Sequence, residues 1–233
     1  MLCQHMSTNV AGKLFVVATP IGNLEDITLR ALRVLKEADL IAAEDTRHTA
    51  QLLNHFEIKK PLVSYHQFNE AKRTAEFREE FAAGKNIALV SDAGMPGVSD
   101  PGERLIRMCV ADKIGVEVIP GASAVLHALV GAGFAMTPFH FGGFLPVKSG
   151  GRRRELAAAA VRECTSVYFE SPYRLERCLV DAAAEIPATQ LCVARELTKK
   201  FEELRRGTGA ELLEHFQTTK PRGEICLVVQ GAG

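Results

Sequence analysis

The chain has 233 residues, of which 47% are hydrophobic and 24% are charged, a composition typical of a globular protein with a sizeable core. Its 28 Lys and Arg side chains balance 28 Asp and Glu side chains, which argues against a broadly basic nucleic-acid-binding protein and leaves room for a local basic patch. The longest apolar stretches are far below the roughly 18–20 residues of a membrane span. The N-terminal residues also lack the apolar core of a signal peptide, so we expect a cytoplasmic protein.

The first half of the chain alternates strand and helix patterns. Residues 1–12 are polar and aperiodic, and we expect them to be disordered. Apolar runs predict strands at 14–18, 40–43, 61–64, 86–90 and 116–119, and helical spacing predicts helices at 28–38, from 46 to about 55, at about 70–83, after Pro101 and from Ala124. Strands that alternate with helices of this length indicate an α/β domain with a largely parallel sheet, which we place at residues 13–133.

The second half repeats this alternation over residues 134–233. It begins with an aromatic and glycine-rich segment at 139–146, followed by a flexible basic loop at 148–154 and an Ala-rich helix. Strands at 166–170, 191–194 and 225–229 and a helix at 172–185 follow. We therefore predict a second α/β domain.

Three turns rich in Gly and Pro follow strands, at 19–23, 92–102 and 120–124. Open α/β sheets bind ligands at the carboxyl ends of their strands, and Gly allows the backbone to approach a ligand closely. Any one of these turns is explained equally well as a tight turn, but three at three strand ends predict a ligand cleft. Neither G-x-G-x-x-G in a strand-to-helix context nor G-x-x-x-x-G-K-[ST] occurs, so the signatures of dinucleotide and ATP sites are missing.

Charged residues at strand ends are the candidates for chemistry. Glu44 and Asp45 stand beside Arg47 and His48, where two acids can orient a sugar hydroxyl and accept its proton. Capping of the following helix by Asp45 or Thr46 is the alternative. His66 lies among aromatic and hydrogen-bonding residues that suit a base or a ribose, although a structural histidine is the more common case.

Basic residues of the second half can hold phosphate. They follow the strands at 166–170 and 191–194 as Arg174, Arg195 and Lys199, and they include Arg152 and Arg153 in the basic loop. That loop is either solvated or an RNA-contacting flap. The six cysteines form no C-x-x-C pair and are expected to be free thiols, and the histidines lack the spacing of a zinc site, so no metal is predicted.

Several strings together are highly specific. They are Thr19–Leu24, Ala43–Arg47, Ser91–Pro96 with Asp100–Gly102, Pro120–Ala124, Phe169–Pro172 and Ala194–Lys199. In combination they resemble the motifs of the ribosomal RNA small-subunit methyltransferase I family, over residues 14 to about 229. Two positions depart from the family pattern, because Tyr173 and Phe68 stand where histidines are expected.

The resemblance implies a tetrapyrrole-methylase fold, with two α/β domains and S-adenosylmethionine in the cleft between them, in a homodimer. It also implies 2′-O-methylation of a cytidine in the decoding region of small-subunit (16S) ribosomal RNA, as free RNA or in the assembled subunit. The cofactor contacts carried over by position are Pro20, Asp92, Ala93, Gly94, Met95, Ser123, Ala124, Leu145 and Ala194.

Glu44, Asp45 and Glu196 are the candidates for the proton acceptor. The candidate RNA contacts are Arg47, His66, Arg152, Arg153, Arg174 and Lys199. Two rival functions stay open: a methyltransferase of the same fold for a small tetrapyrrole or a diphthamide precursor, and a non-catalytic RNA-binding module.

Overall fold

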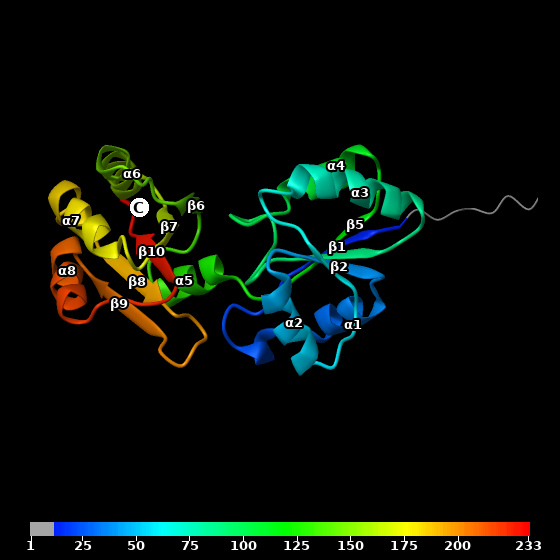
Figure 1. Cartoon of the computed structure of the whole chain (residues 1–233). Helices are drawn as coiled ribbons and strands as arrows, with labels where there is room; N and C mark the ends of the chain where they lie inside the picture. The colour runs from blue at the N-terminus through cyan, green and yellow to red at the C-terminus, as the bar shows by residue number, and fades with distance from the viewer. Residues whose placement is uncertain (1–11) are drawn as a thin grey trace, which may run out of the picture. The chain divides into compact units, whose positions relative to one another are not determined.

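The computed structural model describes residues 12–233 (Figure 1). The chain divides into two compact units, the first ending at Ala122 and the second comprising Ser123–Gly233. Our predicted boundary follows residue 133; helix α5 (Ala124–Ala132) lies in the second unit because it packs on the sheet there. Of residues 1–12, for which we predicted disorder, only Gly12 is described, and its N–H donates to the Phe81 carbonyl at 2.9 Å.

The first unit contains a parallel five-stranded sheet, as the alternation of strands and helices predicted. Its strand order is β3-β2-β4-β1-β5, and every strand pair is parallel. The strands are β1 (Leu14–Val17), β2 (Leu40–Ala43), β3 (Leu62–Ser64), β4 (Ile87–Val90) and β5 (Val116–Ile119). The carboxyl ends of all five strands therefore lie at one edge of the sheet.

Helices cover both faces of this sheet (Figure 1). In β2, Leu40 and Ala42 pack into one buried cluster, and Ile41 and Ala43 pack into another. Because successive strand residues point to opposite faces, the strand is buried on both sides, which explains its uninterrupted apolar sequence. The cluster of Ile41 and Ala43 includes side chains from α1 (Leu29–Glu37) and α2 (Thr46–His55). The cluster of Leu40 and Ala42 includes side chains from α3 (Glu70–Ala82) and α4 (Glu103–Ala111). The short 3₁₀ helix η1 (Leu24–Asp26) precedes α1.

The second unit contains a mixed five-stranded sheet of order β6-β7-β10-β8-β9, in which only the β6–β7 pair is parallel. The strands are β6 (Phe139–Phe144), β7 (Thr165–Glu170), β8 (Leu191–Arg195), β9 (Glu203–Gly207) and β10 (Ile225–Val229). Helices α6 (Ser149–Val161), α7 (Leu175–Glu185) and α8 (Gly209–Thr218) contribute to one buried cluster. Ile225 and Leu227 face that cluster, whereas the Cys226 thiol between them reaches the carbonyl of Ala124 in α5. Helix α5 thus covers the opposite face.

In the second unit one sequence prediction is wrong, and two elements were not predicted. The prediction of a flexible basic loop at 148–154 is wrong, because α6 begins at Ser149. Within its first turns the Arg152 side chain is only 5% exposed and pairs with Asp181 of α7, so this charge holds two helices together. Strand β9 and helix α8 were missed altogether. Helix α8 begins at a capping box in which the Thr208 and Glu211 side chains each accept a backbone N–H of the other residue.

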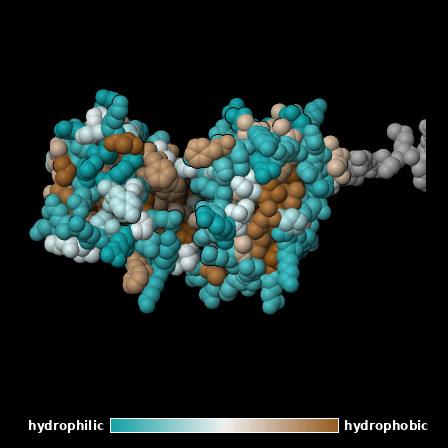
Figure 2. All heavy atoms as spheres, viewed as in Figure 1, coloured by the Kyte–Doolittle hydropathy of each residue, from teal (hydrophilic) through white to brown (hydrophobic). Residues whose placement is uncertain are grey.

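The surface is mostly hydrophilic in the view of Figure 2, with hydrophobic patches on each unit. No described helix has both the length and the apolar composition needed to cross a membrane. Five of the six cysteines lie within the described part of the chain, all as free thiols, and only Cys164 among them is not buried.

Candidate active site

The turns after β1 and β4 are joined at the carboxyl edge of the first sheet. Thr19 and Gly94 exchange two backbone hydrogen bonds, of 2.9 and 3.1 Å, and the Thr19 hydroxyl donates to the Ser91 carbonyl at 3.2 Å. Gly94 adopts a φ of 75°, a left-handed conformation that glycine adopts without steric cost. The predicted cofactor residues Pro20, Asp92, Ala93, Gly94 and Met95 are brought together by this bridge.

The turn after β5 needs a glycine for a different reason. A Cβ atom on Gly121 would lie 2.8 Å from the Cβ atom of Ala18, which follows β1. The chain leaving β5 therefore passes directly against the chain leaving β1. This close approach places all three glycine-containing turns at neighbouring strand ends, as expected for a ligand site in an open α/β sheet.

Glu44, directly after β2, is an acid at this edge whose pKa lies above its ordinary value. Burial raises the pKa of its carboxyl above the ordinary value and the nearby Asp92 carboxylate raises it further, while a hydrogen bond with the Asp92 backbone and the proximity of His66 lower it. The net shift is upward. A partly buried carboxylate with a raised pKa is suited to accept a proton.

Asp45, its neighbour in sequence, has a structural role. Its side chain caps α2 by accepting the Arg47 N–H at 2.8 Å and also pairs with the Arg47 guanidinium at 2.7 Å. These hydrogen bonds hold the pKa of Asp45 well below its usual range. The Asp45 N–H in turn donates to the Asp92 side chain at 3.0 Å, which ties the start of α2 to the loop after β4. Helix capping, the alternative considered from the sequence, is thus what Asp45 does here.

His66 lies after β3, close to Glu44. Its backbone N–H donates to the Asn69 side chain at 2.8 Å, and its Nδ1 accepts the Phe68 N–H at 3.3 Å. The Arg47 side chain is 88% exposed despite its ion pair. Glu44, Asp45, Arg47, His66 and Asp92 therefore share the carboxyl edge of the first sheet.

In the second unit, the predicted cofactor residues gather around Cys226 of β10. Cys226 lies opposite Ala194 in β8 and opposite Phe169 in β7. The Leu145 N–H donates to the Phe169 carbonyl at 3.4 Å, and the Cys226 thiol lies 3.7 Å from the Ala124 carbonyl. Ala124, Leu145 and Ala194 therefore lie at one end of this sheet. From the sequence, Cys226 was expected only to be a free thiol.

Ser123, the other predicted cofactor residue of this unit, caps α5. Its side chain accepts the Leu126 N–H at 3.4 Å. The start of α5 thus lies beside the end of the sheet around Cys226, since Ala124 is its first residue.

Arg174 holds the backbone near Leu145. Its guanidinium donates to the Leu145 carbonyl at 2.6 Å and pairs at 2.9 Å with Glu170, whose side chain is fully buried. The contacts with Glu170 and Leu145 explain why Arg174 stands at this position. The position of Arg174 therefore needs no phosphate-binding role to explain it. The partner Glu170 was not among the site residues predicted from the sequence.

Glu196, the third predicted proton acceptor, is bound to a cation. Lys199 lies 3.0 Å from Glu196 and 2.8 Å from Glu224. Burial raises the pKa of Glu196, but hydrogen bonds from Lys199 and from the Glu224 backbone lower it more, so the net shift is downward. The same shift makes Glu196 a weaker base than Glu44.

The two arginines predicted to contact RNA from the basic segment are both paired. Besides its ion pair, Arg152 donates to the Val147 carbonyl at 3.1 Å, and it has almost no exposed surface for a phosphate. Arg153 is 46% exposed and pairs with Glu185 of α7. Among residues 12–233, no cluster of His, Cys, Asp or Glu side chains is arranged to hold a metal ion.

Comparison with known proteins identifies relatives of this fold and site. Residues 13–213 match the family of tetrapyrrole (corrin/porphyrin) methylases. The chain is 48% identical over 222 residues to the ribosomal RNA small subunit methyltransferase I of Synechocystis sp., covering 95% of this chain and 80% of that protein. It is 47% identical over 220 residues to the protein of the same name from Thermotoga maritima, covering 94% of this chain and 99% of that protein.

A solved structure shares the fold at low sequence identity. The uroporphyrin-III C-methyl transferase from Thermus thermophilus, complexed with S-adenyl homocysteine, is 18% identical with a TM-score of 0.62, covering 94% of this chain and 97% of that chain. The fold and the sequence matches agree. The chain belongs to the tetrapyrrole (corrin/porphyrin) methylase family and, within it, to the ribosomal RNA small subunit methyltransferase I family.

Proposed function

We propose that this protein transfers a methyl group from S-adenosylmethionine to the ribose 2′-oxygen of a cytidine in the decoding region of small-subunit ribosomal RNA. The observation that carries the proposal is the identity of nearly half over almost the whole chain with proteins named ribosomal RNA small subunit methyltransferase I. It is supported by a raised-pKa carboxylate, Glu44, beside the glycine-containing turns of the first sheet.

The residues present fit a sulfonium cofactor. In the first unit, Pro20 and the segment Asp92–Met95 would hold it, where Gly94 and the Thr19 bridge keep the backbone in a fixed turn. In the second unit, Ser123, Ala124, Leu145 and Ala194 would do so. S-adenyl homocysteine is present in the solved relative from Thermus thermophilus, which supports the same cofactor class here. The bound cofactor supplies an activated methyl group.

The chain's own residues then have to position the ribose and take its proton. Glu44 is the proton acceptor in this proposal, because its pKa is raised while those of Asp45 and Glu196 are lowered. Asp45 positions Arg47 and the Asp92 loop through its hydrogen bonds. Holding the hydroxyl in line with the methyl group can lower the barrier by roughly 7–11 kcal/mol on effective-molarity estimates.

The RNA contacts proposed on exposed or partly exposed side chains are Arg47 and His66 in the first unit, and Arg153 and Lys199 in the second. Arg152 and Arg174 are not among them, since the Arg152 side chain is only 5% exposed and the Arg174 guanidinium binds the Leu145 carbonyl and the fully buried Glu170. We further propose that the protein works in the cytoplasm as a homodimer, and that its substrate is the small-subunit RNA, either free or in the assembled subunit.

Two measurements test this function. Calorimetry with S-adenosylmethionine should show one site per chain. Incubation with tritiated S-adenosylmethionine should then label small ribosomal subunits or their free RNA from a strain lacking the endogenous enzyme, and nucleoside mapping should recover 2′-O-methylcytidine. Absence of cofactor binding would reject the enzyme altogether and favour a non-catalytic RNA-binding module.

The second candidate is a methyltransferase for a small tetrapyrrole or a diphthamide precursor, since such enzymes share the fold. Cofactor binding without labelling of either RNA substrate, together with labelling of a tetrapyrrole such as uroporphyrinogen III, would favour it. The raised-pKa Glu44 and the 88% exposed Arg47 at one strand end favour a substrate that carries both a hydroxyl and a phosphate.

A further inference from the structure

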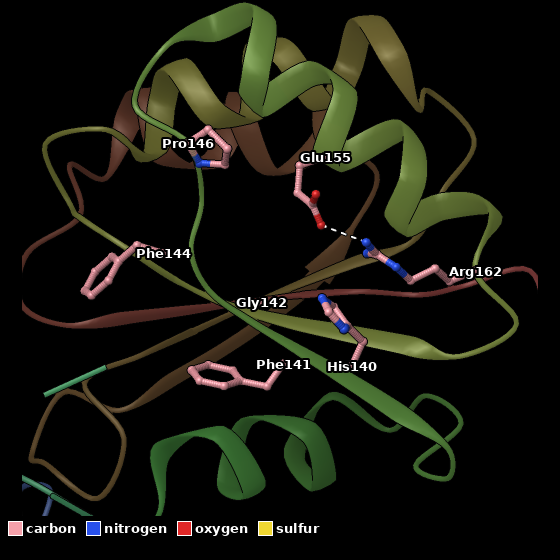
Figure 3. A pocket seen from close by; sticks show the side chains of 7 residues that line it. All are labelled: His140, Phe141, Gly142, Phe144, Pro146, Glu155 and Arg162. Atoms are coloured by element: carbon pink, nitrogen blue, oxygen red, sulfur yellow. Dashed lines mark hydrogen bonds and ion pairs between the residues drawn. The ribbon is translucent and has the colours of Figure 1, made fainter. Parts of the chain in front are cut away.

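A pocket of about 410 Å³ lies at the β6 edge of the second unit, away from the residues assigned above except for its neighbour Leu145. It is lined by His140, Phe141, Gly142, Phe144, Pro146, Glu155 and Arg162 (Figure 3). Glu155 and Arg162 come from α6 and the residue following it, and the other five come from β6 and the turn after it. The pocket lies at the edge strand of the sheet and is open to solvent.

A glycine in the middle of β6 lets the Tyr168 ring approach the strand beside the pocket. A Cβ atom on Gly142 would lie 2.3 Å from the ring of Tyr168, so any larger residue there would displace that ring. The register between β6 and β7 shifts between Phe141 and Phe144, and Gly143 within that shift has a φ of 64°. The backbone of β6 at Gly142 therefore packs directly against the Tyr168 ring, next to the pocket that Gly142 lines.

The polar wall of the pocket is held rigid from behind. The Glu155 Oε1 atom accepts hydrogen bonds from the Tyr168 hydroxyl at 2.7 Å and from Arg162 at 2.9 Å, and Arg162 also donates to the Tyr168 hydroxyl at 2.8 Å. The Oε2 atom of Glu155 has no hydrogen-bond partner within residues 12–233, and its side chain is 30% exposed. A fixed carboxylate thus offers one open acceptor atom.

His140 lines the pocket in the neighbourhood of Glu155. Its ring lies edge-on to Tyr168 at 6.3 Å between centroids, and it is near enough to Glu155 to lower the pKa of that carboxyl. Burial alone would raise the pKa of Glu155, but hydrogen bonds from Tyr168 and Arg162 outweigh it, so the carboxylate is ionised at neutral pH. An ionised carboxylate only accepts hydrogen bonds.

Aromatic rings form the other wall. Phe144 is 58% exposed, and its ring lies 5.5 Å from Phe169. Phe141 lies 5.1 Å from the same Phe169 ring, and Phe141 and Phe144 both line the pocket (Figure 3). Phe144 is therefore braced from behind and exposed in front. Flipped or single-stranded bases stack on exposed rings of this kind while their edges are read by polar groups.

We propose that this pocket binds a nucleobase of the RNA substrate that carries an exocyclic amino group, stacked on Phe144 and donating to Glu155. The proposal rests on the function proposed above. A carboxylate acceptor pairs with the amino group of cytosine, whereas the uracil edge presents a carbonyl there and is disfavoured. Lys148 and Arg154 stand near the start of α6, exposed and without an ion-pair partner among residues 12–233, where they can contact the adjoining phosphates.

The test measures binding of fluorescein-labelled hexacytidylate and hexauridylate by fluorescence anisotropy, without cofactor. The wild-type protein should bind hexacytidylate more tightly. Phe144→Ala should weaken both by about tenfold, since loss of one base stack costs about that much. Glu155→Gln keeps an oxygen for Arg162 but exchanges the open acceptor for an amide donor, so it should reverse the preference toward hexauridylate by about tenfold.

Matched controls are available in the same unit. Phe139→Ala removes an aromatic ring of β6 that is 40% exposed and does not line the pocket, and Glu163→Gln neutralises an exposed carboxylate just beyond α6; both should bind like the wild type. The inference is overturned if Phe144→Ala or Glu155→Gln matches its control, or if Phe139→Ala weakens binding equally. The methylation assay on small subunits is run in parallel. If the wild type methylates RNA but the pocket substitutions leave oligonucleotide binding unchanged, only this inference is rejected. If the substitutions change oligonucleotide binding but the wild type methylates no RNA, only the proposed function is rejected.

Discussion

At the scale of single residues, the pKa values of two adjacent acids, Glu44 and Asp45, are shifted in opposite directions. Asp45 lies at the start of a helix, where it accepts the Arg47 N–H and is held ionised. Glu44 belongs to the end of a buried strand, where burial and the Asp92 carboxylate raise its pKa. One residue of displacement along the chain thus separates the structural carboxylate from the one suited to act as a base.

We expect Glu44→Gln to lower the rate of methyl transfer by about 10²–10⁴-fold, the usual contribution of a general base, with unchanged affinity for S-adenosylmethionine. The wild-type rate should rise with pH through the raised pKa of Glu44, because only the ionised form accepts a proton. Single-turnover labelling from pH 5 to 8 measures this. A variant with the wild-type rate and pH profile would remove Glu44 from the mechanism.

The same carboxyl has a predictable effect on stability. Its pKa is raised in the folded state, so between the ordinary and the raised value the folded protein binds more protons than the unfolded one. Stability then falls as pH rises through that window. Glu44→Gln should therefore be at least as stable as the wild type at pH 7, with the difference shrinking toward about pH 4. Urea unfolding at both pH values tests the sign, and a variant less stable at pH 7 than at pH 4 relative to wild type would contradict it.

The roles of these residues could not be separated by sequence alone. Asp at a helix start and Glu at a strand end are both acids beside Arg47, and the same residue types serve capping and proton transfer. The strand-end position of the cluster was predictable, because the apolar run before it is clear. Hydrogen bonding and burial decide the rest, and both depend on Asp92, which is distant in sequence.

At the scale of elements, α6 shows how a basic run can be misjudged. The Lys148–Arg154 segment contains two glycines and four cations, and it was interpreted as a flexible loop. In the structure its residues from Ser149 onward are helical, and Arg152 alone turns inward to Asp181. Sequence spacing within the run gives no sign of which cation is buried, because the partner lies on α7.

Arg152→Ala should destabilise the protein by about 3–5 kcal/mol, the usual cost of leaving one buried charge unpaired. Arg154→Ala, on the exposed side of the same helix, should change stability by less than about 0.5 kcal/mol. Denaturant unfolding compares the two variants. Equal effects of the two substitutions would show that the Arg152–Asp181 pair does not stabilise the packing of α6 on α7.

Two glycines in different elements should respond oppositely to alanine. Gly94 has a φ of 75°, so Gly94→Ala should cost about 1–2 kcal/mol and weaken binding of S-adenosylmethionine. Gly150 is helical, with nothing within 4 Å of an added Cβ, so Gly150→Ala should stabilise the protein by up to about 1 kcal/mol and leave cofactor binding unchanged. Thermal unfolding and calorimetry measure both, and cofactor affinity unchanged in Gly94→Ala would place the cofactor elsewhere.

The buried strands were predictable, and the edge elements were not. Strands covered on both faces, such as β2 and β4, have continuous apolar sequences. Strand β9 has the sequence ELRRG, is partly exposed and pairs on one side only. Its charged residues therefore give no apolar run from which a strand could be predicted. The pocket beneath α6 could not be predicted from the sequence either, because its lining depends on the close approach of Gly142 in β6 to Tyr168 in β7.

At the scale of the whole molecule, each unit has its own buried core. The first sheet is packed on both faces, with Leu89 in one of its two clusters, and the second sheet carries a separate cluster that includes Leu227. No described cluster takes residues from both units. Each unit therefore has the apolar interior needed to hold its own half of the predicted site residues in place.

Substitutions in the two cores should act locally. Leu89→Ala and Leu227→Ala should each cost about 2–5 kcal/mol, because both side chains are at most 1% exposed. Hydrogen–deuterium exchange should accelerate in β1, β2 and β4 for the first variant, and in β7, β8 and β10 for the second. Equal acceleration of both sheets by either substitution would show that the units unfold as one.

The place of β10 in the second sheet also affects how the protein folds during synthesis. Strand β10 lies between β7 and β8, yet it is translated after every other strand of that sheet. All strands of the first unit have been synthesised once Ile119 is added to the chain. At a translation rate of about 5–20 residues per second, the first unit can fold for roughly 5–20 s before Val229 is added. Until then β7 and β8 present unpaired edges. A frameshift or nonsense codon just before Ile225 would leave the first sheet intact and the second without its middle strand, so we expect such a chain to be removed by proteolysis.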